Sequence, residues 1–178
     1  MSPRKHSVDA TKGVLEIEWP FFGELSRGLA LKVSRDYIPD LVIGIANAGV
    51  IPGAVVAAIF GCEFHSLIVS RRHRTASPRS APEVFGSAPD VVEGRRVLIV
   101  DETCDSGDTI RLAVAAVIEA GCLDVRTAVA IRTGAFEPDF HAIATESTIV
   151  LPWDREVLVD GELMVNPLYA DALRGDSE

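Results

Sequence analysis

The sequence is most informative at residues 97–110, which read Val97-Leu98-Ile99-Val100-Asp101-Glu102-Thr103-Cys104-Asp105-Ser106-Gly107-Asp108-Thr109-Ile110. The first four residues are a short apolar run, which predicts a buried strand. Two adjacent carboxylates follow, and a turn of small and polar residues then leads into an apolar-periodic helix that starts at Thr109. The amides of such a loop and helix start attract phosphate, and paired carboxylates accept hydrogen bonds from sugar hydroxyls or hold hydrated magnesium. The stretch therefore predicts a site for a sugar phosphate.

Composition predicts one domain with its own core, since 48% of the 178 residues are hydrophobic. We expect residues 1–12 to be a disordered tail and residues 13–178 to form the domain. No apolar run approaches the roughly 20 residues of a membrane helix, and residues 1–6 lack the apolar stretch of a signal peptide. Three cysteines without C-x-x-C spacing favour a reduced, cytoplasmic protein. The net charge of −9 disfavours non-specific nucleic-acid binding, which depends on basic residues.

The order of the expected elements indicates an α/β fold. Apolar periodicity predicts helices over residues 19–36 and 109–120, and a proline in the first turn with a glycine stop predicts one over residues 51–60. Apolar runs predict strands over residues 41–45, 64–69, 97–100, 125–131 and 148–151. Alternating strands and helices predict a right-handed parallel sheet, in which ligands bind at the carboxyl ends of the strands. Asn47, Asp101 and Arg132 each follow a predicted strand, so we expect them to converge on one crevice. We expect Asp101 and Glu102 to face solvent there.

Residues 70–93 break the pattern with three prolines, four serines, four arginines and almost no apolar periodicity. A structureless segment of this length inside a domain is expected to be a functional lid or a disordered loop. The basic residues Arg71, Arg72 and Arg74 cluster at its start. In an acidic protein this cluster indicates either an anion partner or a solvated run of charge.

Residues 97–110 resemble the signature with which type I phosphoribosyltransferases bind 5-phosphoribosyl 1-pyrophosphate (PRPP), and every defining position of that signature is filled. The resemblance implies a Rossmann-like parallel-sheet core with a small hood, mainly residues 152–178, and a long flexible loop at 70–93. It also implies that Asp101 and Glu102 hold the ribose hydroxyls and Mg²⁺, largely through water and PRPP itself. The implied 5′-phosphate site consists of Asp105, Ser106, Gly107, Asp108 and Thr109.

Two further stretches are similar to the same family. Residues 45–53 resemble its pyrophosphate loop, with Asn47, Ala48 and Gly49 at the turn, although Asn47 replaces the usual basic side chain; an ordinary strand-to-helix turn is the alternative. The loop at 70–93 stands where the family has its mobile catalytic loop.

Residues 128–155 resemble the base-binding end of the xanthine-guanine and archaeal hypoxanthine-guanine branch. There Arg132 takes the place of a Lys that contacts the purine O6, although Lys and Arg are not interchangeable. Trp153, followed by Asp154, takes the place of an aromatic residue that stacks on the base. Packing in the core of the hood is the alternative for Trp153.

The resemblance implies a pentosyltransferase of purine salvage. Such an enzyme moves the 5-phosphoribosyl group from PRPP to a nitrogen base and releases pyrophosphate, and the branch that residues 128–155 resemble indicates a 6-oxopurine as the base. Asp105 matches the residue proposed to take the purine N7 proton, with capping of the next helix as its other role. A PRPP- or nucleotide-sensing regulator with little catalysis, and transfer to a non-purine acceptor, remain alternatives. We expect a cytoplasmic homodimer. Cys104 lies beside a helix start that can favour a thiolate, but no His is paired with it in sequence.

Overall fold

A computed structural model describes residues 12–70, 83–85, 87–170 and 172–173. The chain divides into two compact units, a larger one of residues 23–145 and a smaller one of residues 1–22 and 146–178. The segments expected to be a disordered tail and the start of a mobile loop lie mostly outside the described residues.

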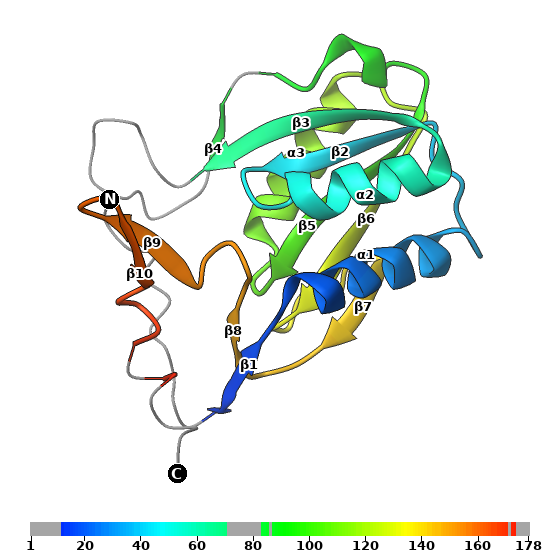
Figure 1. Cartoon of the computed structure of the whole chain (residues 1–178). Helices are drawn as coiled ribbons and strands as arrows, with labels where there is room; N and C mark the ends of the chain where they lie inside the picture. The colour runs from blue at the N-terminus through cyan, green and yellow to red at the C-terminus, as the bar shows by residue number, and fades with distance from the viewer. Residues whose placement is uncertain (1–11, 71–82, 86, 171, 174–178) are drawn as a thin grey trace. The chain divides into compact units, whose positions relative to one another are not determined.

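The larger unit is built on a six-stranded sheet of order β4-β3-β2-β5-β6-β7 (Figure 1). Its strands are β2 (Leu41–Ala46), β3 (Glu63–Ser70), β4 (Glu83–Phe85), β5 (Arg96–Cys104), β6 (Asp124–Arg132) and β7 (Phe140–Ala144). All neighbouring strands pair in parallel except β4, which is antiparallel to β3. The predicted parallel α/β fold is therefore confirmed. The strands read as continuous apolar runs because both faces of a parallel sheet are covered.

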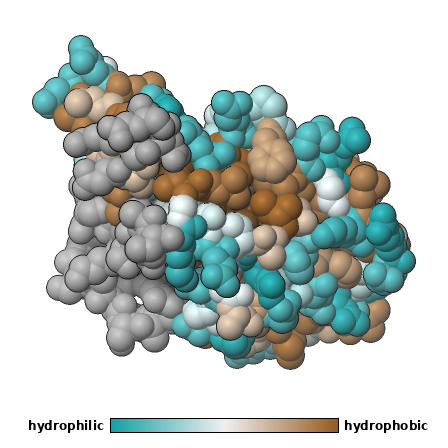
Figure 2. Space-filling model, turned by 90° about the horizontal axis from the view of Figure 1, so that it is seen from below, coloured by the Kyte–Doolittle hydropathy of each residue, from teal (hydrophilic) through white to brown (hydrophobic). Residues whose placement is uncertain are grey.

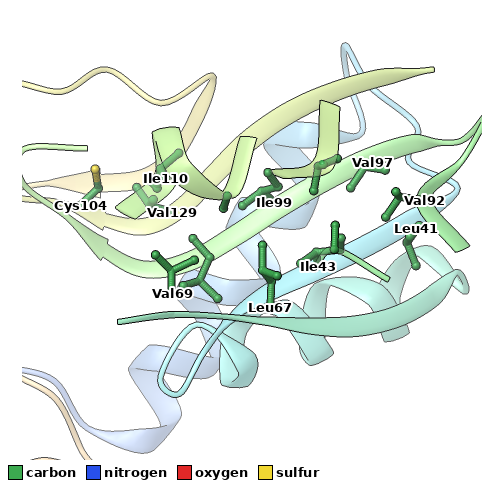
Figure 3. Close-up of a cluster of buried hydrophobic side chains, with 14 residues drawn as sticks. Leu41, Ile43, Leu67, Val69, Val92, Val97, Ile99, Cys104, Ile110 and Val129 are labelled. Carbon is green, nitrogen blue, oxygen red and sulfur yellow. The ribbon is translucent and has the colours of Figure 1, made fainter. Parts of the chain in front are cut away.

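Helices cover both faces of this sheet. The helix α3 (Asp108–Glu119) packs on one face, where its Ile110, Ala113 and Val117 join a core with alternate residues of β2 and β5 (Figure 3). The helices α1 (Trp19–Val33) and α2 (Val50–Phe60) supply the core of the other face, with Val42 and Leu98 pointing toward them. Successive residues of a strand point to opposite faces, which is why one strand serves both cores.

The strand β5 runs four residues further than predicted and ends at Cys104 instead of Val100. Its pairing with β6 continues through Asp101 opposite Val129 and Cys104 opposite Arg132. Asp101 and Glu102 are therefore strand residues, each 8% exposed. The expectation that they face solvent was wrong, because β5 continues here as a strand paired with β6, and the loop after β2 lies against Asp101.

Part of the segment 70–93 has regular structure that the sequence did not reveal. The strand β4 pairs with the end of β3, and the 3₁₀ turn η2 (Asp90–Val92) buries Val92 in the core below α3. The expectation of a wholly structureless segment was thus wrong over residues 83–85 and 90–92. Arg71, Arg72 and Arg74 lie outside the described residues.

The smaller unit combines residues from both ends of the chain. The strand β1 (Val14–Glu16) pairs in parallel with β8 (Thr148–Val150). The strands β9 (Glu156–Val159) and β10 (Glu162–Val165) form a hairpin whose turn, Asp160-Gly161, has positive φ at both residues, as type I′ turns require. The predicted strand at 148–151 is present, but it belongs to this unit and not to the six-stranded sheet.

Some large apolar side chains remain at the surface, and Figure 2 shows one face with a hydrophobic area bordered by polar residues. Within the part of the chain that the structure describes, no helix is long and apolar enough to cross a membrane.

Candidate functional site

Three neighbouring parallel strands, β2, β5 and β6, end at the same edge of the larger unit's sheet. The segments that follow them are residues 47–49, residues 105–107 and the loop of residues 133–137. The sequence predicted this convergence for Asn47, Asp101 and Arg132, and all three lie at or just beyond the carboxyl ends of these strands. Ligands of α/β proteins bind at this edge.

The loop after β2 lies directly against β5. The peptide bond between Ala46 and Asn47 is cis, Asn47 is exposed and Ala48 is buried. Gly49 caps the N-terminus of α2, and a Cβ atom at this position would come within 3 Å of both Asp101 and the Val100 carbonyl oxygen. The structure thus brings the predicted pyrophosphate loop into contact with the predicted ribose site, and only a glycine fits at the contact.

The acidic pair is fixed in the sheet, where the Glu102 backbone N–H donates to Asp101 Oδ1 at 3.0 Å. Both side chains are buried and both make interactions within the protein. Among the residues that the structure describes, no three His, Cys, Asp or Glu side chains are arranged to hold a metal. Two carboxylates still fit Mg²⁺, which proteins commonly bind through one or two carboxylates, water and substrate phosphates.

The loop that follows β5 leads into the N-terminus of α3. Asp105 and Ser106 are exposed, and Gly107 is the N-cap residue, with φ +77°. The Asp108 backbone N–H is 3.4 Å from Ser106 Oγ. The helix therefore begins one residue before Thr109, and it is capped by Gly107 and not by Asp105. A loop of this kind directs backbone N–H groups toward an anion.

The loop of residues 133–137 holds the loop after β5 from one side. The backbone N–H and the hydroxyl of Thr133 donate to the Cys104 carbonyl oxygen at 2.8 and 3.1 Å. The Phe136 N–H donates to the Asp105 carbonyl oxygen at 3.3 Å. Gly134 lies against the Asp105 carboxylate, because a Cβ at Gly134 would overlap it. Sequence reasoning missed these residues, since short connecting loops carry no periodic pattern.

Arg132 lies at the end of β6 with its side chain 25% exposed. One guanidinium nitrogen, Nη1, forms an ion pair with Glu137. Its Nε is buried and has no hydrogen-bond partner among the residues that the structure describes. Buried N–H groups without a partner are rare, so this atom is an unsatisfied donor among the described residues.

The other two predicted base residues belong to the smaller unit. The ring of Trp153 lies edge-on to Phe22 at 4.8 Å and tilted against Trp19 at 5.7 Å. Its Nε1 is buried, again with no partner in the described part of the chain. Asp154 Oδ2 accepts a hydrogen bond from the Tyr169 hydroxyl at 2.8 Å. Trp153 therefore packs within the hood, and its stacking on a base together with Arg132 stays a prediction.

The Cys104 thiol, at the end of β5, is buried in the core that α3 covers. Burial, with a further contribution from the charge of Asp101, raises the pKa of Cys104 to about 11. Thiols react as thiolates, so a protonated thiol at neutral pH does not serve as a nucleophile. The three cysteines are all free, and Cys104 has a structural role.

Residues 17–159 match the family described as phosphoribosyl transferase domain. Adenine phosphoribosyltransferase of Nocardia farcinica is 31% identical over 102 residues, which are 52% of this chain and 53% of that protein. Ribose-phosphate pyrophosphokinase of Maricaulis maris is 30% identical over 95 residues, which are 52% of this chain and 29% of that protein. The chain thus spans about half or less of the length of these curated relatives.

The solved structure of a purine phosphoribosyltransferase from Pyrococcus horikoshii superimposes on this one with a TM-score of 0.65 at 25% identity. The superposition covers 83% of this chain and 98% of that one. The resemblance of residues 97–110 is therefore part of a structural similarity that extends over most of the chain.

Proposed function

Because the chain belongs to the phosphoribosyl transferase domain family, we propose that it transfers the 5-phosphoribosyl group from PRPP to a nitrogen of a 6-oxopurine and releases pyrophosphate. The observation that carries this proposal is the contact of Gly49 with Asp101, since it joins a candidate pyrophosphate loop to a candidate ribose site. The third element of the site is the phosphate loop before α3, which continues the same strand. PRPP has these three chemical parts in this order: pyrophosphate, ribose and 5′-phosphate.

The proposed reaction passes through a transition state that resembles an oxocarbenium ion, as in glycoside hydrolysis. The protein must orient the ribose and stabilise the departing anion, with no covalent step of its own. Asp101 and Glu102 would accept hydrogen bonds from the 2′- and 3′-hydroxyls. Bound Mg²⁺ would supply positive charge to PRPP, held by the same two carboxylates largely through water.

The 5′-phosphate would bind the loop of Asp105, Ser106, Gly107, Asp108 and Thr109, where α3 begins. Asp105 is exposed beside this loop, so its carboxylate is accessible to the N7 proton of an incoming purine. The N–H groups of Asn47, Ala48 and Gly49 would face the pyrophosphate. Asn47 brings no charge, so the arginines of the expected catalytic loop, Arg71, Arg72 and Arg74, would provide it.

At the base end we propose that Arg132 donates to the purine O6 and that Trp153, with Asp154, closes over the ring. The unpartnered Nε of Arg132 supports the first role, as far as the described residues go. An acceptor such as O6 satisfies that buried donor, whereas the amino group of adenine cannot. Adenine is nevertheless the competing acceptor, since the Nocardia relative is named for it.

Pyrophosphate release from PRPP with hypoxanthine, guanine, xanthine, adenine and uracil tests this function. We expect turnover with the 6-oxopurines and little with uracil. Tight binding of PRPP without turnover of any base would instead support a regulatory protein that senses PRPP or nucleotides. Turnover with adenine alone would contradict the assignment of Arg132, and turnover with uracil alone would point to a non-purine acceptor.

We further propose that the protein is a cytoplasmic homodimer. The outer stripe of α2, Ala54, Val55, Ala58 and Ile59, is exposed and lacks any polar side chain. Exposed apolar patches commonly mark interaction surfaces. Free cysteines are typical of a reducing compartment. Light scattering coupled to gel filtration tests the dimer, and Val55→Asp with Ile59→Asp should yield a monomer.

A further inference from the structure

The aromatic ring of Phe136 lies against the glycine of the loop before α3. A Cβ atom at Gly107 would overlap this ring, and Gly107 already has the positive φ that favours glycine. Phe136 itself is half-buried and packs against the core under α3. The ring therefore forms a fixed support beneath the backbone that the proposed function gives to the 5′-phosphate.

Arg111, in the first turn of α3, binds both the ring and the loop. Its guanidinium carbon lies 4.8 Å from the centre of the Phe136 ring. Its Nη1 donates to the Ser106 carbonyl oxygen at 2.8 Å and lies 3.2 Å from Asp108 Oδ1. A guanidinium can stack on a ring and donate in its own plane at the same time, which an ammonium cannot.

Hydrogen bonds from Thr133 and from the Phe136 N–H already hold the Cys104 and Asp105 carbonyl oxygens, but the Ser106 and Gly107 part of the loop makes its contacts to Arg111 and the Phe136 ring. Its side chains at Asp105 and Ser106 are exposed, and Gly107 is conformationally permissive. Binding a phosphate through backbone N–H groups requires those groups to be held in place. The catalytic rate is equally sensitive to position, since a misplacement of about 1 Å can lower it by about 100-fold. The Phe136 ring and Arg111 therefore add support from outside the loop to the hydrogen bonds that the segment 133–137 makes with it.

We propose that Phe136 and Arg111 are positioning residues that hold the Asp105–Gly107 loop for the 5′-phosphate. This inference rests on the proposed function and adds to it that a base-side segment shapes the phosphate site. Phe136 lies in the loop that starts after Arg132 and is closed by the Arg132–Glu137 ion pair. One short segment therefore connects the proposed base contact to the phosphate loop.

The test compares GMP with guanosine, and separately measures PRPP, in calorimetric titrations of Arg111→Ala and Phe136→Leu. The leucine keeps most of the buried volume and removes the ring. We expect each variant to bind GMP and PRPP about ten-fold or more weakly, with guanosine affinity little changed. Arg27→Ala is the matched control, because Arg27 also forms an exposed i,i+3 ion pair on a helix, with Glu24 at 3.5 Å.

Arg111→Lys separates position from charge. The lysine keeps the positive charge but loses the stacked fork, so we expect it to bind GMP almost as weakly as the alanine variant. Full restoration by lysine would overturn the inference, since charge alone would then suffice. Equal losses for GMP and guanosine, or wild-type affinities in both variants, would also overturn it.

Turnover and ligand binding by the wild-type protein test the proposed function independently of these variants. A wild-type protein that binds PRPP but turns over no base refutes the enzyme, while the PRPP affinities of the variants still decide the positioning role. A wild-type protein that binds neither PRPP nor GMP refutes both proposals.

Discussion

Gly49 and Asp101 touch across two strands of the sheet. A Cβ atom built on Gly49 would lie 2.6 Å from Asp101 Oδ1, 2.7 Å from the Ile45 carbonyl oxygen and 2.8 Å from the Val100 carbonyl oxygen. The two carbonyl oxygens belong to the backbones of β2 and β5, and Asp101 Oδ1 accepts a hydrogen bond from the Glu102 N–H at 3.0 Å, so the contact has little room to give. The turn after β2 can therefore lie this close to Asp101 only with a glycine at position 49.

Gly49→Ala should therefore damage the site and the fold together. Overpacking of a rigid contact costs about 1–3 kcal/mol of the free energy of unfolding, and we expect PRPP affinity to fall at least ten-fold. Thermal unfolding and calorimetry measure the two effects. Gly28→Ala is the control, because Gly28 lies in α1 with no atom within 4 Å of its added Cβ. That variant should gain up to about 1 kcal/mol and bind PRPP normally. Normal PRPP binding by Gly49→Ala would refute the contact.

The double variant Asp101→Asn, Glu102→Gln should lose PRPP binding while keeping its fold. The amides have nearly the volume of the carboxylates, but they lack the charge that attracts Mg²⁺ and strengthens hydrogen bonds to the ribose. Calorimetry with PRPP and Mg²⁺ measures binding, and circular dichroism checks the fold. Asp36→Asn with Glu119→Gln changes the net charge equally at exposed positions and should bind normally. Unchanged affinity in the first variant would remove the ribose site from these residues.

Base choice should depend on Arg132. We expect GMP or IMP to bind more tightly than AMP or UMP, by about 1–3 kcal/mol, because a buried donor without an acceptor is costly. Arg132→Ala should abolish most of this preference, as measured by competition titration. If UMP binds as tightly as GMP, the 6-oxopurine assignment is wrong.

The role of Trp153 is best tested with a conservative substitution, because its ring packs on Phe22 and Trp19 in the smaller unit. Trp153→Phe should preserve much of this packing and weaken all purine nucleotides together, without changing their order. Thermal unfolding in parallel reports the packing. Unchanged affinity for every purine nucleotide, or a loss confined to one of them, would contradict a stacking role.

The Cys104 thiol should be unreactive in the folded protein. Its pKa is raised from 9.0 to about 11, so iodoacetamide at pH 8 should label it much more slowly than in denaturant. Because the folded pKa is the higher one, the protonated thiol contributes stability below pH 9, and that contribution is lost as the pH rises from about 9 toward 11. In Cys104→Ala the fall in melting temperature over this range should be smaller. Rapid labelling of Cys104 itself in the folded protein would contradict this burial.

Local pattern was sufficient to predict the core of the larger unit. The apolar runs of β2, β5 and β6, the periodicity of α3, and the Pro52 and Gly61 signals that delimit α2 are properties of neighbouring residues, so their positions follow from the sequence. The same holds for the acidic pair and the Ser106-Gly107 turn, whose spacing alone carries the resemblance to the phosphoribosyltransferases. The convergence at one edge followed too, because parallel strands all end on the same side.

Tertiary structure alone decided where these elements stop and which of them meet. β5 extends through Asp101 because β6 continues to pair with it, and no residue near Val100 signals that. Residues 14–16 join residues 148–150 in one strand pair, and the Arg111 guanidinium lies against the Phe136 ring. Such contacts join residues far apart in the chain, and their energy depends on register and packing that exist only after folding. A single sequence records the local preferences of each partner but leaves the pairing itself unstated.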